Sequence, residues 1–146
     1  MMEYKPKISG YTTVYNARIQ GYPFVECIKS MLQFCDEVCI VDGGSTDDSW
    51  AFLENWANVE PKLVLKQIKR DWSHPRFAVF DGLQKAEARK LCTGDFCWQM
   101  DCDEIVHEED SEKIVHLSKK FPMNVDLISL PVVEYWGGPE KVRADV

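Results

Sequence analysis

The sequence predicts an α/β fold with three layers, in which helices cover both faces of a central, mostly parallel sheet. Three observations support this class of fold. Strand-like and helix-like runs alternate along the chain, one strand-like run is apolar at nearly every position, and polar or glycine-rich stretches follow several strand ends. An apolar strand is typical of a parallel sheet that is buried on both faces. The alternation is typical of right-handed β-α-β crossovers.

The first half of the chain predicts two strands and two helices. Residues 7–14 (KISGYTTV) are rich in β-branched and aromatic residues, which favours a strand. Residues 23–34 begin with a proline and carry apolar residues at helical spacing, which favours a helix. Residues 37–41 (EVCIV) are the apolar strand. A glycine-rich turn follows, and a second helix is expected over residues 47–56.

The second half continues the alternation. Residues 62–68 (KLVLKQI) alternate between apolar and polar side chains and predict a third strand. A helix over residues 77–91, a strand over 95–100 (DFCWQM) and a helix over 111–120 follow. Residues 126–133 (DLISLPVV) predict a final strand, which its proline would move to a sheet edge or a bulge.

The composition is that of one globular domain. The chain has 146 residues, 45 % of them hydrophobic, and a net charge of −7. This acidic balance argues against a nucleic-acid backbone or an anionic membrane surface as the main partner. No run approaches the roughly 18 apolar residues of a membrane-spanning helix. The first residues also lack the apolar segment of a signal peptide, so we expect a cytoplasmic protein without an integral membrane segment.

The six cysteines form no C-x-x-C pair, which argues against a zinc site. Several of them lie within apolar, strand-like runs. We therefore expect reduced cysteines packed in the core of a cytoplasmic protein.

Three polar stretches, TVYNAR, VDGGSTDD and DCDE, each follow a predicted strand. The carboxyl ends of parallel strands lie at one edge of a sheet, and ligands bind there at the point where the strand order switches. We therefore expect these stretches to form one site.

The DCDE stretch suggests a metal site. If the strand continues through Asp101 and Asp103, their side chains point to the same face, because side chains alternate along a strand. Two carboxylates on one face can hold a Mg²⁺ or Mn²⁺ ion, and such an ion can bind a diphosphate. The alternative is a solvated acidic turn that leads into a helix.

The two earlier turns suggest nucleotide contacts. Asp42 could accept hydrogen bonds from a ribose hydroxyl or a base N–H, and Gly43 lets a ligand approach the backbone. The alternative for Asp42 is a strand–helix turn with an Asx cap. Tyr15 could stack on a base or be a core aromatic residue. Asn16 could fix the turn, and Arg18 could contact a phosphate or remain a solvated cation.

The segments ISGYTTVYNAR, DEVCIVDGGSTDDSW and GDFCWQMDCDE together resemble the nucleotide-sugar glycosyltransferases of family 2, which have the GT-A fold. The resemblance covers roughly residues 7–110, and the segments occur in the family's order. It implies one GT-A-like nucleotide-sugar-binding and catalytic domain over residues 1–146. Because members of the family usually continue well past the D-x-D motif, we expect the acceptor-side region to be incomplete here.

The resemblance implies an inverting, metal-dependent transfer of a sugar from a nucleoside diphosphate to a glycan or lipid-linked glycan. UDP is the expected nucleotide of the donor. Mn²⁺ or Mg²⁺ would be the cofactor, held by Asp101 and Asp103. The segments DGLQKAEAR and DCDE look most similar to the branch that builds lipopolysaccharide core and other surface glycans. The expected donor-binding residues are Thr13, Tyr15, Asn16, Arg18, Asp42, Gly43, Gln84, Lys85, Arg89, Asp101 and Cys102.

Catalysis is expected to involve Asp103 and a carboxylate base late in the chain. Glu134, in PVVEYWGG, is the candidate base, and a salt-bridged residue at a strand end is the alternative interpretation. The family often has a second acidic residue where this chain has Gly43, which leaves the base contact open. Gln84, Lys85 and Arg89 could equally belong to the solvated face of a helix.

Two other functions remain open from the sequence. A nucleotide-sugar-binding module without catalysis would bind the donor but not turn it over. A sugar nucleotidyltransferase would be expected to carry a glycine-rich phosphate loop after the first strand, and TVYNAR has no glycine. A homodimer and a peripheral position at the inner face of a membrane are both compatible with the sequence.

Overall fold

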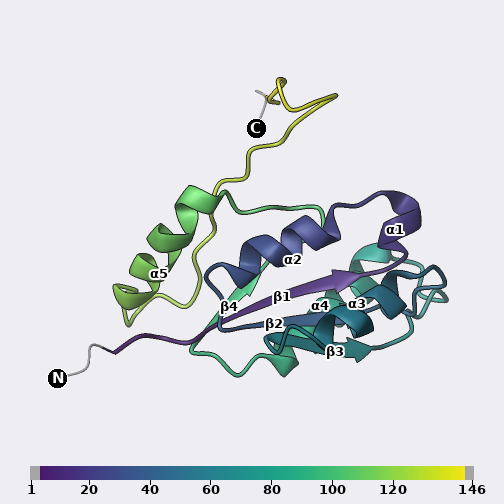
Figure 1. Ribbon diagram of the computed structural model, residues 1–146, viewed down its shortest axis with the longest axis horizontal. Helices are drawn as coiled ribbons and strands as arrows, with labels where there is room; N and C mark the ends of the chain where they lie inside the picture. The colour runs from purple at the N-terminus through teal and green to yellow at the C-terminus, as the bar shows by residue number, and fades with distance from the viewer. Residues whose placement is uncertain (1–3, 144–146) are drawn as a thin grey trace.

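The computed structural model describes residues 4–143 and shows four parallel strands with flanking helices (Figure 1). A short helix after the first strand and a one-turn 3-10 helix before the last helix were not predicted from the sequence. In chain order the elements are β1 (Ile8–Val14), α1 (Ala17–Gln20), α2 (Phe24–Leu32), β2 (Glu37–Asp42), α3 (Ser49–Ala57), β3 (Leu63–Gln67), α4 (Phe77–Leu91), β4 (Phe96–Gln99), η1 (Glu108–Asp110) and α5 (Ser111–Lys119).

The strand order is β3-β2-β1-β4, and every neighbouring pair is parallel. The chain therefore adds strands outward from β1 to β3 and then crosses back to the other side of β1. This switch in strand order lies between β1 and β4. β1 is buried at every position because it has a neighbour on each side and helices on both faces.

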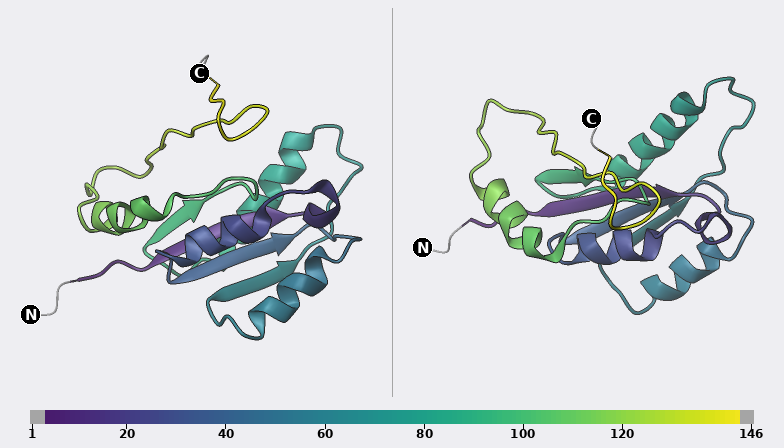
Figure 2. Two further views of the ribbon diagram at one scale, coloured as in Figure 1. Left: turned by 45° about the horizontal axis from the view of Figure 1, so that its top comes forward. Right: turned by 90° about the horizontal axis from the view of Figure 1, so that it is seen from above.

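The helices make the two outer layers of the predicted three-layer fold. Figure 2 shows α4 on one side of the sheet and α2 and α3 on the other. The larger hydrophobic cluster joins the sheet to α2, α3 and α5 through side chains such as Ile28, Leu53 and Ile114. A smaller cluster packs Ala88 of α4 against Tyr11 of β1. The predicted α/β class and parallel sheet are confirmed.

The predicted elements up to α5 are present, and their ends shift by no more than one or two residues. Helix α3 begins at Ser49 rather than at residue 47, and helix α4 has the predicted bounds, Phe77–Leu91. Strand β4 ends at Gln99, so Asp101 and Asp103 lie in a turn beyond the strand. The alternation argument that would have aligned these two carboxylates on one face therefore does not apply.

The predicted strand over residues 126–133 is wrong. These residues are irregular and mostly exposed, with Leu127 at 82 % and Val132 at 60 % of full exposure. Local β-propensity does not make a strand unless a neighbour completes its hydrogen-bond ladder, and none pairs with this segment within residues 4–143. The part of the chain from residue 121 to 143, which we call the C-terminal segment, runs away from the sheet (Figure 1).

The cysteines are all free thiols. Cys27, Cys35 and Cys39 are buried, as expected, whereas Cys97 is exposed on β4. This difference arises because β4 has one strand neighbour and less cover than β1 or β2. Among the described residues, no helix is both long and apolar enough to cross a membrane.

Candidate functional site

The three polar stretches gather at one edge of the sheet, as the strand order requires. Val14, the last residue of β1, lies opposite Asp42, the last residue of β2. On the other side of β1, Gln99 of β4 lies opposite Tyr11, and the D-x-D turn follows directly. The candidate site is thus built where β1 and β4 meet, at the switch in strand order.

Asp42 is wholly buried and anchors the turn after β2. Its Oδ1 accepts hydrogen bonds from the backbone N–H groups of Gly44 and Ser45, at 2.9 and 2.8 Å, and from Gln67 Nε2 at 3.0 Å. Its Oδ2 accepts a hydrogen bond from Ser45 Oγ at 2.5 Å. The geometry is the Asx-type turn that was the alternative to a nucleotide contact. A carboxylate has about four acceptor positions, so most of those on Asp42 are used within its own loop.

Asn16 ties the turn after β1 to the turn after β2. Its backbone is left-handed, with φ 49° and ψ 36°, a conformation that Asn adopts more readily than most residues. Its Oδ1 accepts a hydrogen bond from Thr46 N at 2.7 Å, and its own N–H donates to Ser45 Oγ at 2.8 Å. Asn16 therefore fixes both turns relative to one another.

Gly43 makes room for two long side chains. A Cβ placed on Gly43 would lie 2.8 Å from Arg70 Nε and 3.0 Å from Gln84 Oε1. Those two atoms form a hydrogen bond of 2.8 Å, and Gln84 Nε2 donates to the carbonyl of Ile68 at 2.7 Å. The space beside Gly43, where relatives often carry a carboxylate according to the resemblance, is occupied here by the Arg70–Gln84 pair.

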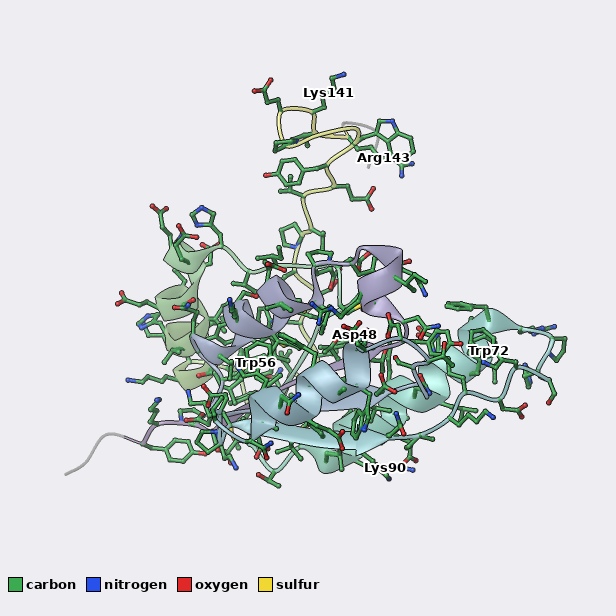
Figure 3. All side chains as sticks on the ribbon, turned by 45° about the vertical axis from the view of Figure 1, so that its right-hand side comes forward. Asp48, Trp56, Trp72, Lys90, Lys141 and Arg143 are labelled. Carbon is green, nitrogen blue, oxygen red and sulfur yellow. The ribbon has the colours of Figure 1, made fainter. Side chains whose placement is uncertain are left out.

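The Arg70 side chain packs among aromatic rings at the edge of the sheet. Its side chain is 10 % exposed, and its guanidinium carbon lies 5.0 Å from the ring centre of Tyr15 and 5.8 Å from that of Trp72. The rings of Tyr15 and Trp72 are 5.1 Å apart. Figure 3 shows Trp72 on the loop beyond β3. Contact of a guanidinium with aromatic faces is favourable, so Tyr15 already has a cation beside its ring.

A line of alternating charges connects this loop to the D-x-D turn. Arg70 Nη2 lies 3.8 Å from Asp81 Oδ1, and Asp81 Oδ2 lies 3.1 Å from Lys85 Nζ. Lys85 Nζ then lies 2.6 Å from Asp101 Oδ1. Burial by itself lowers the pKa of Lys85, but the hydrogen bonds with Asp101 and Asp81 outweigh it, so this pKa is raised. Lys85 is therefore a cation at neutral pH.

The D-x-D turn presents carboxylates to solvent. The side chain of Asp101 is half exposed, and Asp103 is exposed. The backbone N–H of Asp101 donates to Glu104 Oε2 at 2.9 Å, which holds the turn closed. Cys102 points toward the core, where burial, reinforced by the charges of Asp103 and Asp101, raises its pKa to about 11.

These residues fit a hard divalent cation. Asp101 already binds a positive group, the Lys85 ammonium, and Asp101 and Asp103 supply the oxygen ligands that Mg²⁺ and Mn²⁺ prefer. Among residues 4–143, no group of three or more acidic, histidine or cysteine side chains is placed to hold a metal. The two carboxylates would therefore need further ligands from a bound diphosphate and water.

Several predicted site residues lie apart from this line of charges. Arg18 pairs with Asp48 at 3.3 Å and covers the ring of Phe52, so it belongs to the start of α3. Arg89 is exposed in the last turn of α4, one turn beyond Lys85. Thr13 is buried in β1 beside the edge.

Glu134 lies in the C-terminal segment, where its Oε2 accepts a hydrogen bond from Arg143 Nη1 at 3.2 Å. Figure 3 shows Arg143 at the far end of this segment, away from Trp72 and the sheet edge. Glu134 is therefore salt-bridged, as the alternative interpretation expected, and it does not lie at the D-x-D turn. Its assignment as the base stays a prediction.

Arg70 and Asp81 were missed in the sequence, although both take part in the site. Arg70 follows directly on a predicted strand, in the segment IKRDW, and so lies at the same sheet edge as the other motifs. That position was the available signal. The sequence carries no comparable signal for Asp81, because an aspartate four residues before a lysine on a helix is typical of an exposed ion pair.

Comparison with known proteins agrees with this fold. The family model described as "Glycosyl transferase family 2" matches residues 11–139. A crystal structure of S. aureus TarS 1–349 has 21 % sequence identity and a TM-score of 0.62, covering 87 % of this chain and 39 % of that one. The same fragment in complex with UDP gives a TM-score of 0.61 at 21 % identity, covering 87 % and 38 %.

The mannosyltransferase PcManGT from Pyrobaculum calidifontis, in complex with GDP-Man and Mn²⁺, has 20 % identity and a TM-score of 0.59. The match covers 80 % of this chain and 32 % of that one, so the chain spans less than half the length of these solved structures. No curated protein sequence matches the chain.

The sheet, its helices and the site at its switch point define an α/β protein of the GT-A type. The chain belongs to glycosyltransferase family 2.

Proposed function

We propose that this chain forms the donor-binding part of a glycosyltransferase that moves a sugar from a nucleoside diphosphate to an acceptor hydroxyl. UDP is the proposed nucleotide, and a glycan or lipid-linked glycan is the proposed acceptor. The observation that carries the proposal is the contact of 2.6 Å between Lys85 and the half-exposed Asp101 at the switch point. It sets a cation and a cation ligand side by side, as recognition of a metal diphosphate requires.

The residues of the site support distinct tasks in this reaction. Arg70 and Lys85 supply positive charge for the donor's phosphates, and Asp81 holds both in place. Asp101 and Asp103 would hold Mg²⁺ or Mn²⁺, which supplies charge neutralisation for the departing diphosphate. Tyr15 and Trp72 offer ring faces for the base or sugar. Asp42 and Asn16 hold the two turns in position through their hydrogen bonds to Ser45 and Thr46, and Asp42 is the proposed contact of the base.

We further propose inversion at the anomeric carbon, with a carboxylate base that deprotonates the acceptor. Glu134 is the candidate within this chain, and it would have to leave Arg143 and approach the sheet edge. We also propose that residues 1–146 act as one nucleotide-sugar-binding domain. The single parallel sheet with helices packed on both faces supports this view.

A second candidate function is a nucleotide-sugar-binding module without catalysis. The position of Glu134, exposed and paired with Arg143 in the C-terminal segment, favours this alternative. The two functions predict the same donor binding and differ in turnover. Release of UDP from UDP-sugars, with and without glycan acceptors, separates them.

The experiment that tests donor binding is calorimetric titration of UDP into the protein with and without Mn²⁺. We expect binding that requires the metal and that falls at least about tenfold, or about 1.4 kcal/mol, in Asp103→Asn. Glu108→Gln is the matched control, because Glu108 is an exposed carboxylate in the same acidic stretch and lies outside the D-x-D turn. Absence of UDP binding in the presence of Mn²⁺, or equal loss in both variants, contradicts the proposed donor site.

A further inference from the structure

The Lys85 ammonium lies between two carboxylates that come from different elements. Asp81 is on the same helix, four residues earlier, and Asp101 is in the D-x-D turn. The Lys85 side chain is only 23 % exposed, so solvent screens these contacts less than it screens a surface ion pair. Lys85 therefore connects helix α4 to the turn that the metal would use.

A divalent cation and the Lys85 ammonium compete for the same carboxylate. The ammonium lies 2.6 Å from Asp101 Oδ1, and a metal ion bound to that carboxylate would stand at about 2.0–2.6 Å from its oxygens. Two cations that close repel each other strongly. A metal ion that takes Asp101 Oδ1 therefore displaces Lys85 from that oxygen.

Asp81 limits where Lys85 can go. Its Oδ2 lies 3.1 Å from Lys85 Nζ, and its Oδ1 lies 3.8 Å from Arg70 Nη2. A Lys85 side chain that leaves Asp101 therefore keeps a carboxylate partner on its own helix, the same one that faces Arg70.

We propose that Lys85 couples the binding of the divalent cation to the binding of the nucleoside diphosphate. Without ligands, Lys85 occupies Asp101 and weakens the binding of the cation alone. When the cation and the diphosphate bind together, Lys85 exchanges Asp101 for a phosphate oxygen, so the two ligands strengthen each other. This inference rests on the proposed donor function and adds a mutual dependence between its two ligands.

The test measures Mn²⁺ affinity from the electron paramagnetic resonance signal of the free ion, with and without saturating UDP. For wild type we expect weak binding of Mn²⁺ alone and binding at least about tenfold tighter with UDP, a coupling of typical size. In Lys85→Met we expect Mn²⁺ alone to bind several-fold tighter. The gain from UDP should shrink to less than half of the wild-type factor.

Lys90→Met is the control, since Lys90 is an exposed lysine on the same helix that pairs with Glu87. Its affinities should match those of wild type. Loss of a positive charge alone would raise Mn²⁺ affinity equally with and without UDP, so an unchanged coupling factor in Lys85→Met overturns the proposal. The reciprocal measurement, UDP affinity with and without Mn²⁺, must give the same factor.

The outcomes also separate this inference from the proposed function. UDP binding that does not need Mn²⁺ would leave a nucleotide site in place and overturn the coupling. Absence of both Mn²⁺ and UDP binding would overturn the donor function itself, and the coupling with it. Tighter Mn²⁺ binding in Lys85→Met together with a reduced effect of UDP supports both.

Discussion

The side-chain oxygen of Asn16 accepts a hydrogen bond from the backbone N–H of Thr46, 2.7 Å away. The same oxygen lies 3.3 Å from the N–H of Asp47, and Asn16 Nδ2 donates to Thr46 Oγ1 at 3.2 Å. One amide thereby joins the segment after β1 to the segment after β2. The two polar stretches, which were expected to contribute to one site, are tied together as a single structural unit.

Replacing Asn16 by alanine should lower the free energy of unfolding by about 2–3 kcal/mol, because the left-handed backbone disfavours alanine and hydrogen bonds are lost. Glycine adopts the left-handed backbone without strain, so Asn16→Gly loses only the side-chain hydrogen bonds. It should lower the free energy of unfolding by about 1 kcal/mol. Urea unfolding followed by tryptophan fluorescence measures both. Asn58→Ala, at an ordinary helical backbone position, is the control. An equal loss of unfolding free energy in all three variants would show that Asn16 does not tie the turns.

Gly43→Ala should destabilise the protein by about 1–3 kcal/mol, because its Cβ would lie 2.8 Å from Arg70 Nε and displace that side chain. Gly82→Ala is the matched control. No atom lies within 4 Å of a Cβ at Gly82, which is inside α4, and alanine should stabilise the helix there by up to about 1 kcal/mol.

The cause of the Gly43 effect is checked in an Arg70→Ala background. If the Arg70 side chain is the obstacle, the cost of Gly43→Ala should fall by more than half there, since residues in contact are not additive. Thermal unfolding of the four proteins closes this cycle. An unchanged cost in the double variant would place the obstacle elsewhere in the loop.

Glu37 should make the free energy of unfolding depend on pH in the acidic range. Burial raises the pKa of Glu37, but hydrogen bonds from Ser9, Thr93 and Lys7 outweigh it and lower the pKa to about 2. A carboxylate with a lowered pKa stabilises the folded state above its ordinary pKa, and this contribution is lost as the pH falls toward 2. A shift from 4.5 to about 2 corresponds to about 3 kcal/mol.

Glu37→Gln should therefore be less stable than wild type by about 3 kcal/mol at pH 7, and the difference should shrink between pH 4.5 and 2. Urea unfolding at several pH values measures it. Glu54→Gln, at an exposed position on α3, should show a small difference that does not change with pH. A constant difference for Glu37→Gln would contradict the assigned hydrogen bonds.

Cys97 should be the thiol that reacts first with N-ethylmaleimide in the folded protein, because it is exposed on β4. Cys35 is 1 % exposed, and burial raises its pKa to about 12, so it should react only when the protein unfolds. Peptide mass spectrometry after timed labelling at pH 7 distinguishes the sites, and Cys97→Ser should remove the fast phase. Labelling of Cys35 at the rate of Cys97 would contradict the burial of the segment between α2 and β2.

Most of the fold could be predicted because its strands and helices carry their own patterns. The helix Phe77–Leu91 was predicted with its observed bounds, and the apolar run over residues 37–41 predicted the strand Glu37–Asp42 to within one residue. Residues 126–133 carry a strand pattern just as clear, yet they form none. Whether a strand exists depends on a neighbour that completes its ladder, and the pattern of one segment does not contain that information.

The site was predicted in outline but not in its contacts. Asp42 was recognised by its place after a strand, but its carboxylate is used by the N–H groups of its own loop. Lys85 was identified, whereas its partners Asp81 and Asp101 were not connected to it. Asp81 lies four residues before Lys85 on the same helix, a spacing that is typical of an exposed ion pair and does not mark a site. The contact of Lys85 with Asp101 depends on how α4 packs across β1 and β2, and these two residues lie too far apart in sequence for spacing to reveal it.

The contact between Gly43, Arg70 and Gln84 has a consequence for how related sequences can diverge. A side chain at position 43 and a long cation at position 70 compete for one space, so neither can change freely while the other stays. Among relatives, a carboxylate at position 43 should occur with a smaller residue at position 70, and glycine should accompany arginine. The exchange would also reverse the charge at this edge of the sheet, so the two positions should change together rather than one at a time.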